Sequence, residues 1–202
     1  MRYTTVELRW FLPGPLPLPV LDWFGSLGSG MAAPPPRTDR YLVLRGRDDL
    51  GIKLREGRLE IKGRTAELGA CRLGPRVVGE VEAWCKWSLA AEEAQAPMRV
   101  LDADPESGVP VRKDRALRRF VTTEAGVREA PLATLEGCQV EATSLEAPFG
   151  VWWTIALEAL VGPAPGLEPL ATIGEHVLAD FPDTLGERDS RSYPGWLLAH
   201  AP

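Results

Sequence analysis

The chain has 202 residues, of which 45% are hydrophobic and 25% are charged, a composition typical of a globular protein with a full hydrophobic core. We therefore expect a single domain over residues 1–202. The formal net charge of −5 argues against binding to duplex nucleic acid, because that binding depends on summed positive charge. Any basic site must therefore be local.

The sequence also argues against a membrane segment and against metal or redox sites built from cysteine or histidine. No apolar run approaches the roughly 20 residues of a membrane helix, and the longest candidate, residues 11–24, is interrupted by four prolines. We therefore expect a cytoplasmic protein without a membrane partner. The three cysteines form no C-x-x-C pair and are expected to be free thiols, and two histidines leave little room for histidine-ligated metals.

Strand-like segments with period-2 alternation recur along the chain between Gly, Pro and Asp clusters. The first strand is expected at 3–12, followed by a short helix at 19–27 and a proline-rich loop at 28–38. The later strands are expected at 39–46, in a hairpin at 51–64, and at 76–89, 109–123, 138–145 and 151–160. Helical spacing predicts two terminal helices at 169–181 and 193–200.

This order of elements predicts an α+β fold. About eight antiparallel strands with helices only at the margins favour a closed eight-stranded barrel, since closure removes the exposed edges of the sheet. The next question is which face of the strands is polar.

One face of nearly every predicted strand carries charges of both signs. In the hairpin at 51–64, Ile52, Leu54, Leu59 and Ile61 face away from the charged side chains, because residues i and i+2 share a face. The charged face holds, strand by strand, Thr5, Glu7 and Arg9; Lys53 and Arg55; Glu60, Lys62 and Arg64; Glu80, Glu82, Trp84 and Lys86; Lys113, Arg115 and Arg119; Gln139, Glu141 and Thr143; and Glu158.

Two arrangements can produce this pattern. An open antiparallel sheet with one solvated face also alternates, and that is the common case. However, the polar positions are almost all Arg, Lys or Glu, with little Ser or Asn. We therefore expect a closed barrel with a charged interior, in which excess Arg and Lys bind a polyanion and the carboxylates serve hard cations.

Several segments in the same order resemble the CYTH superfamily, also called triphosphate tunnel metalloenzymes. They are T-V-E-L-R at 5–9, G-I-K-L-R at 51–55, L-E-I-K at 59–62, V-E-A-W-C-K at 81–86, K-x-R at 113–115, C-Q-V-E-A-T at 138–143 and S-R-S-Y-P-G-W-L-L at 190–198. The resemblance implies an eight-stranded antiparallel tunnel. It also implies hydrolysis of inorganic triphosphate, thiamine triphosphate or RNA 5′-triphosphate ends with Mg²⁺ or Mn²⁺, or in some members synthesis of cyclic AMP.

The resemblance and the charged face together suggest site roles. The substrate phosphates would be bound by Arg9, Lys53, Arg55, Lys62, Arg64, Lys86, Lys113, Arg115 and Arg119. One divalent ion would be held by Glu7, Glu82 and Glu141. A carboxylate at Glu60 or Glu158 would orient the attacking water. The expected ligand is a small phosphoanion such as tripolyphosphate, a nucleotide or thiamine triphosphate.

The sequence departs from the family pattern at carboxylate positions. The family's opening E-x-E-x-K is here Thr5-x-Glu7-x-Arg9, and Gln139 and Thr143 flank Glu141. Three hypotheses therefore stay open: a metal-dependent triphosphatase, a phosphoanion-binding module that has lost the metal site, and a calycin-like barrel with an apolar pocket, suggested by the seven tryptophans. The oligomeric state, a homodimer included, is also open.

Overall fold

The computed structural model describes residues 2–90, 108–161 and 167–201. Strands make up most of the elements in these ranges, and the helices lie toward the two ends of the chain. Their bounds are β1 Arg2–Pro13, α1 Leu18–Ser26, β2 Arg37–Leu42, β3 Leu50–Arg55, β4 Arg58–Arg72, β5 Val78–Leu89, β6 Val109–Thr123, β7 Gly126–Ala130, β8 Cys138–Ala147, β9 Gly150–Val161, α3 Glu168–Leu178, the 3-10 turn η1 Glu187–Asp189 and α4 Tyr193–His200.

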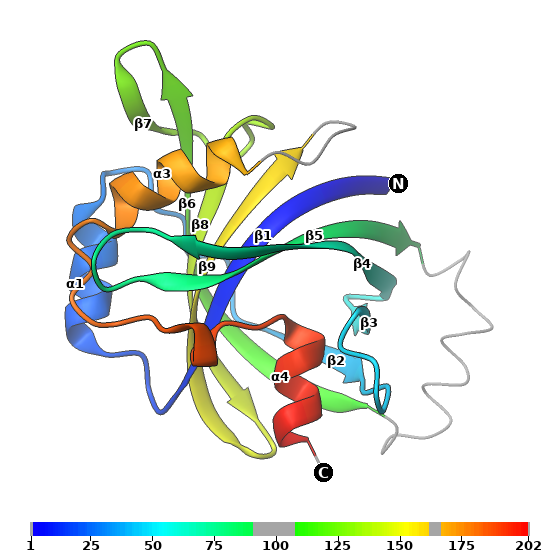
Figure 1. Ribbon diagram of the computed structural model, residues 1–202. Helices are drawn as coiled ribbons and strands as arrows, with labels where there is room; N and C mark the ends of the chain where they lie inside the picture. Colours follow the sequence, from blue (N-terminus) through cyan, green and yellow to red (C-terminus); the bar gives the residue numbers. More distant parts are fainter. Residues whose placement is uncertain (1, 91–107, 162–166, 202) are drawn as a thin grey trace.

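The strands form one antiparallel sheet that closes on itself (Figure 1). Over the described residues the order is β2-β3-β4-β5-β1-β9-β8-β6-β7, and β2 also pairs with β6. This last pairing closes eight strands into a barrel, while β7 extends β6 outside it. The α+β class and the closed eight-stranded antiparallel barrel predicted from the sequence, and implied by the CYTH resemblance, are thereby confirmed.

Three strands differ from the expectation. β2 begins at Arg37 and ends at Leu42, where a strand was expected at 39–46. β7 was not predicted; it is a five-residue strand that returns along β6 from a turn at Gly126, whose φ of 109° favours glycine. β4 continues to Arg72, well past the predicted end of the hairpin. Register shifts between Arg64 and Ala66 and between Glu67 and Gly69 interrupt the side-chain alternation there, which hides the strand from a period-2 pattern.

The main hydrophobic core lies outside the barrel wall. Val6, Leu8 and Trp10 of β1 are buried on the face opposite the charged side chains. They belong to a cluster covered by α1 and α3, which Figure 1 shows on the outside of the barrel. The apolar outer face and its helical cover are thus the arrangement that a charged interior requires.

A second apolar cluster lies beneath α4. Trp196 and Leu197 of this helix pack with Phe11, Val111 and Leu145, and the ring of Phe11 stacks on that of Trp196 with centroids 4.8 Å apart. This contact fixes the helix against the barrel and brings its N-terminal residues to the lumen.

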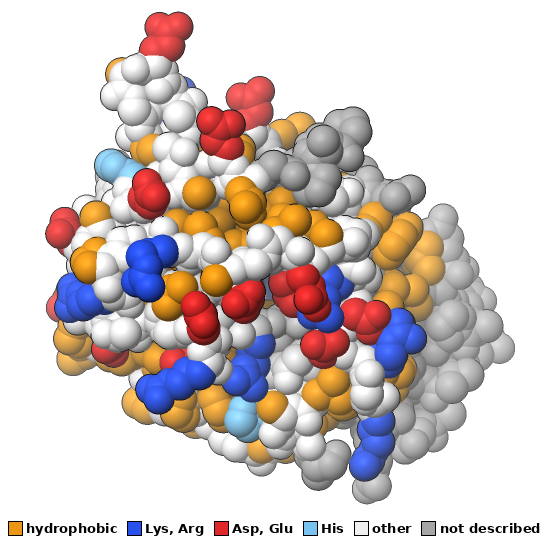
Figure 2. Space-filling model, viewed as in Figure 1, with side chains coloured by type: hydrophobic (Ala, Val, Ile, Leu, Met, Phe, Trp, Pro, Cys, Tyr) orange, Lys and Arg blue, Asp and Glu red, His pale blue; other side chains and the backbone are white. Residues whose placement is uncertain are grey.

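The surface itself does not concentrate cations on the face drawn in Figure 2, where acidic and basic side chains are interspersed. None of the helices within the described ranges is long and apolar enough to span a bilayer.

Arg118 ties the end of α1 to the outer face of β6. Its side chain is almost fully buried. Its guanidinium donates to the carbonyl oxygens of Phe24 (2.9 Å), Gly25 (3.0 Å) and Gly28 (3.0 Å), and it forms an ion pair with Glu129. A buried arginine with this many acceptors fixes the loop that follows α1.

We expect Arg118→Ala to lower the free energy of unfolding by about 3–5 kcal/mol, because it removes a buried charged side chain and leaves the Phe24, Gly25 and Gly28 carbonyls and Glu129 without their donor. Urea denaturation measures the change. Arg112→Ala is the matched control, since Arg112 lies on the same strand in an exposed pair with Glu146 and should cost no more than about 1 kcal/mol. Equal losses in the two variants would contradict this role.

Candidate functional site

The barrel encloses a charged cavity of about 280 Å³. All of the predicted site residues line it except Arg64 and Arg119. Its walls are formed by Glu7, Arg9, Arg37, Tyr41, Gly51, Lys53, Arg55, Glu60, Lys62, Glu80, Glu82, Trp84, Lys86, Lys113, Arg115, Gln139, Glu141, Glu158, Arg191, Ser192, Tyr193 and Pro194. The lining does not match the apolar pocket of the calycin-like hypothesis.

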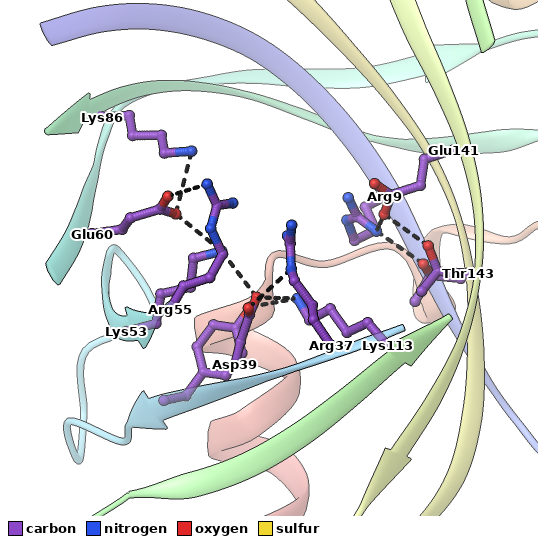
Figure 3. A network of polar contacts seen from close by, with 12 residues as sticks. Arg9, Arg37, Asp39, Lys53, Arg55, Glu60, Lys86, Lys113, Glu141 and Thr143 are labelled. Atoms are coloured by element: carbon purple, nitrogen blue, oxygen red, sulfur yellow. Dashed lines mark hydrogen bonds and ion pairs between the residues drawn. The ribbon is translucent and has the colours of Figure 1, made fainter. Parts of the chain in front are cut away.

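Asp39 on β2 is the first of two buried carboxylates that organise the cations (Figure 3). Its side chain is fully buried and lies 3.1 Å from Arg37 Nε, 3.1 Å from Lys53 Nζ and 3.2 Å from Lys113 Nζ. These cations come from β2, β3 and β6, so Asp39 links both sides of the closing seam between β2 and β6. We call Arg37, Lys53, Arg55, Lys86 and Lys113 the cationic wall.

Glu60 on β4 is the second organising carboxylate. Its side chain is only 3% exposed and lies 2.7 Å from Arg55 Nη2, 3.1 Å from Lys53 Nζ and 3.3 Å from Lys86 Nζ. Lys53 therefore contacts both Asp39 and Glu60 (Figure 3). Two carboxylates thus hold five cations, and the wall keeps a net positive charge.

Burial is the main cause of the lowered pKa values of two wall lysines. Burial lowers the pKa of Lys113 to about 7, although Asp39 acts to raise it. Burial and then the neighbouring Lys113 ammonium lower the pKa of Lys53 to about 8. Burial would raise the pKa of Asp39, but Lys113, Lys53 and Arg37 outweigh it and hold that pKa well below its usual range.

Two arginines at the cavity have guanidinium N–H groups without a hydrogen-bond acceptor among the described residues. Within the described residues Arg115 has no hydrogen bond or ion pair of its side chain. Burial and then Arg37 lower its pKa. Arg55 uses Nη2 for Glu60, while its Nε is buried without a hydrogen-bond partner. An unpaired buried donor is costly, and an incoming anion would satisfy it.

The carboxylates predicted to hold a metal are each engaged by a cation. Glu7 forms an ion pair with Lys62 and accepts a hydrogen bond from Thr5. Thr5, which stands where the family has a carboxylate, therefore holds Glu7 in place. Burial acts to raise the pKa of Glu7, but Lys62 and Thr5 lower it overall.

Glu82 and Glu141 have partners of their own. Glu82 accepts from Arg64 Nη1 (2.6 Å), and Glu141 accepts from Arg9 Nη1 (2.9 Å) and from Thr143 Oγ1 (2.9 Å). In the part of the chain that the structure describes, no three His, Cys, Asp or Glu side chains form a group that could hold a metal ion. Glu7, Glu82 and Glu141 do not fit a preformed divalent site, and metal binding stays a prediction.

Arg64 and Arg119 lie outside the cavity lining. Arg64 is surrounded by carboxylates, with Asp48 and Glu67 each 3.0 Å from Nη2 and Glu82 2.6 Å from Nη1. These carboxylates neutralise its positive charge, which leaves it less available to a ligand. Arg119 is buried farther along β6, beyond the cationic wall.

The two carboxylates predicted to orient water differ in environment. Glu60 is occupied by three cations, and although burial opposes the change, Lys53, Lys86 and Arg55 lower its pKa. Glu158 lies directly opposite Glu7 across β1 and β9. Burial and then the Glu7 carboxylate raise the pKa of Glu158. Their roles in water activation stay predictions.

Several residues in or beside the cavity lining were not assigned a site role from the sequence. Arg37, Asp39 and Tyr41 alternate on β2, so the period-2 signal used elsewhere could have identified them. Tyr193 lies in the quoted C-terminal motif; its ring stacks on Tyr41 with centroids 5.3 Å apart and lies 3.7 Å from Lys113 Nζ. The aromatic pair shields the lysine from water and adds cation–π attraction.

Comparison with known proteins gives distant structural similarities. No family model and no curated protein matches the chain. HpAC1 from Hippeastrum, described as a proposed adenylyl cyclase with a dominant triphosphatase activity, is 16% identical over 87% of this chain and 86% of its own, with a TM-score of 0.41. The PH1012 protein from Pyrococcus horikoshii OT3 is 12% identical over 92% and 94%, with a TM-score of 0.42. Similarity this low says nothing about the chemistry of this chain's own side chains.

The Arg9–Glu141 pair predicts an acid-dependent loss of stability. Burial opposes ionisation of Glu141, but Arg9 and Lys113 lower its pKa to about 2. The stabilisation is therefore complete above the unfolded pKa near 4.5 and is lost as the pH falls toward 2. Glu141→Gln should lower the free energy of unfolding at neutral pH. It should also make the decrease of that free energy between neutral and acid pH smaller by roughly 3 kcal/mol. Denaturation at a series of pH values measures both effects.

Glu146→Gln is the control for this measurement, because Glu146 lies on the same strand in an exposed pair with Arg112. It should leave the pH dependence nearly unchanged. An unaltered acid profile in Glu141→Gln would show that the Arg9 pair does not stabilise the barrel through this carboxylate.

Proposed function

We propose that the barrel lumen binds a small phosphoanion, such as tripolyphosphate or a nucleoside triphosphate, without requiring a metal ion. The observation that carries the proposal is the excess of cations over carboxylates in the wall, together with Arg115, which has no partner in the described ranges. Guanidinium groups bind phosphoryl oxygens bidentately, so the free donors of Arg55 and Arg115 match this ligand.

The geometry of the wall supports convergence on one ligand. Arg37, Lys53 and Lys113 come from three strands and meet at Asp39 (Figure 3). Asp39 and Glu60 hold the cations in position before a ligand arrives, which lowers the entropic cost of binding. An anion would then supply the missing negative charge among partly buried cations.

Hydrolysis of the anion with Mg²⁺ or Mn²⁺ is the second candidate function. It is favoured by the register of three carboxylates, since Glu7 lies directly opposite both Glu82 and Glu158. Lys62 and Arg64 already neutralise Glu7 and Glu82, so we derive no catalytic step from them. Release of phosphate from tripolyphosphate with either metal would support this second function.

The remaining expectations concern domain organisation, cellular location, oligomeric state and ligand identity. A single domain over residues 1–202, a cytoplasmic location and a homodimer stay predictions. Thiamine triphosphate is a further candidate ligand, since it carries the same triphosphate group.

We expect tripolyphosphate to bind the protein in the presence of EDTA, and Arg115→Gln to weaken this binding by about 10- to 100-fold, the range for loss of a charge-assisted hydrogen bond. Isothermal titration calorimetry measures both. Arg112→Gln is the control, because Arg112 is exposed and paired with Glu146. Equal affinities in the two variants, or binding that disappears with EDTA, would contradict metal-independent binding by the wall.

Binding should also take up protons above neutral pH. Lys113 and Lys53 have pKa values of about 7 and about 8, so they are partly neutral in the free protein at mildly alkaline pH. A bound anion favours their charged forms, which requires protons from the buffer. Calorimetry at about pH 8.5 in two buffers of different ionisation enthalpy should show net proton uptake.

Lys113→Met should reduce this uptake, while an exposed change such as Arg112→Gln should not. Binding heats that are independent of the buffer would show that both lysines are already fully charged in the free protein.

A further inference from the structure

A row of three polar side chains crosses the barrel wall beside the cavity. Arg119 of β6 lies directly opposite Gln139 of β8, and Gln139 lies directly opposite Glu158 of β9. Within the described residues, none of these three side chains forms a hydrogen bond or an ion pair. We call these three residues the polar row.

Arg119 is the most unusual member. It is only 7% exposed, and its Nε and Nη1 atoms are buried without a hydrogen-bond partner in the described part of the chain. A buried unpaired charge costs several kcal/mol. Buried guanidinium groups in proteins are normally paired, so this one indicates a missing anionic partner.

Two members of the polar row line the cavity, and Arg119 lies on the same face of the sheet just beyond that lining. Lys113 and Arg115 line the cavity, and Arg119 shares their face of β6 because the β6–β8 register runs without interruption from residue 112 to 120. Gln139 and Glu158 themselves line the cavity. Arg119 lies four residues beyond Arg115, about 13 Å along the strand, so this end of the polar row is separate from Asp39 and the cations around it, whereas Glu158 lies within the electrostatic reach of Lys86.

The chemistry of the row is complementary to one kind of anion. A guanidinium donates hydrogen bonds, an amide both donates and accepts, and a carboxylate accepts. Hydrogen phosphate presents unprotonated oxygens together with one P–O–H group. Sulfate presents only acceptors, and would place an unprotonated oxygen against the Glu158 carboxylate.

We infer that Arg119, Gln139 and Glu158 form a second anion subsite that takes a protonated phosphoryl group. Arg119 and the Gln139 amide donate to its unprotonated oxygens, and Glu158 accepts from its hydroxyl. Rejection of sulfate follows from the unpaired acceptors that it would bring together. The group comes either from free hydrogen phosphate or from a phosphorylated ligand that also occupies the cavity.

Charged groups on neighbouring strands bear on this subsite. Glu7 lies opposite Glu158 but is paired with Lys62, and the positive charges of Lys62 and Lys86 also act on Glu158. These lysines reduce the repulsion between the carboxylates and an incoming anion, while burial, Glu7 and Glu141 act in the opposite direction and raise the pKa of Glu158 overall.

The test compares inorganic phosphate with sulfate by calorimetry near neutral pH. The wild-type protein should bind phosphate at one more site than sulfate. Arg119→Met should remove that additional phosphate site and leave the sulfate isotherm unchanged, because the cationic wall is intact. Arg112→Met is the matched control on the exposed side of β6 and should change neither isotherm.

Two further variants separate the contributions. Glu158→Gln can donate to an unprotonated oxygen, so the preference for phosphate over sulfate should fall by about tenfold. Arg115→Gln should weaken tripolyphosphate binding by the wall yet keep the phosphate preference of the row. Loss of that preference in Arg115→Gln would show that the preference arises in the cavity beside the wall and would contradict the assignment to the row.

The inference is independent of the proposed function of the wall, since either can fail alone. It is overturned if Arg119→Met keeps every phosphate site, or if sulfate binds the wild-type protein at as many sites as phosphate. A crystal structure in phosphate that shows Arg119 paired directly with Glu158, and no anion between them, would also overturn it. If Arg119→Met does not fold, Arg119→Lys keeps the charge without the planar fork and should weaken phosphate alone.

Discussion

The structure depends on two buried carboxylates that are each shared among several cations. Asp39 and Glu60 are both almost completely removed from solvent, and Lys53 contacts the two of them. Neither carboxylate could stay ionised at this burial without its cations, and the cations would repel one another without the carboxylates. The lumen is therefore one electrostatic unit whose residual positive charge is available to a ligand.

The location of the core explains how the barrel tolerates a charged interior. The apolar side chains of β1 point outward to α1 and α3, so burial of hydrocarbon stabilises the barrel from outside. The lumen therefore does not have to supply the hydrophobic core and can hold charged side chains. Beneath α4, by contrast, Phe11 and Trp196 form an apolar contact.

Alternation in the sequence predicted the barrel and most of the lining because side chains of a strand obey a strict two-residue period. The same rule failed in β4 beyond Arg64, where register shifts interrupt the period. It was not applied to β2, so Asp39 was overlooked. Pairing could not be predicted at all: the contacts of Arg64 with Asp48, and of Arg9 with Glu141, join residues distant in the sequence, and they decide which charges are already neutralised within the protein.

The shortness of β2 has a mechanical consequence. This six-residue strand supplies Asp39 and is also the strand whose pairing with β6 closes the barrel. Separation of β2 from β6 would pull Lys113 away from Asp39 and disperse the cations at the same time. Pairing of β2 with β6 and convergence of the cations are thus one cooperative event. Any molecule that binds those cations therefore also stabilises the closed barrel.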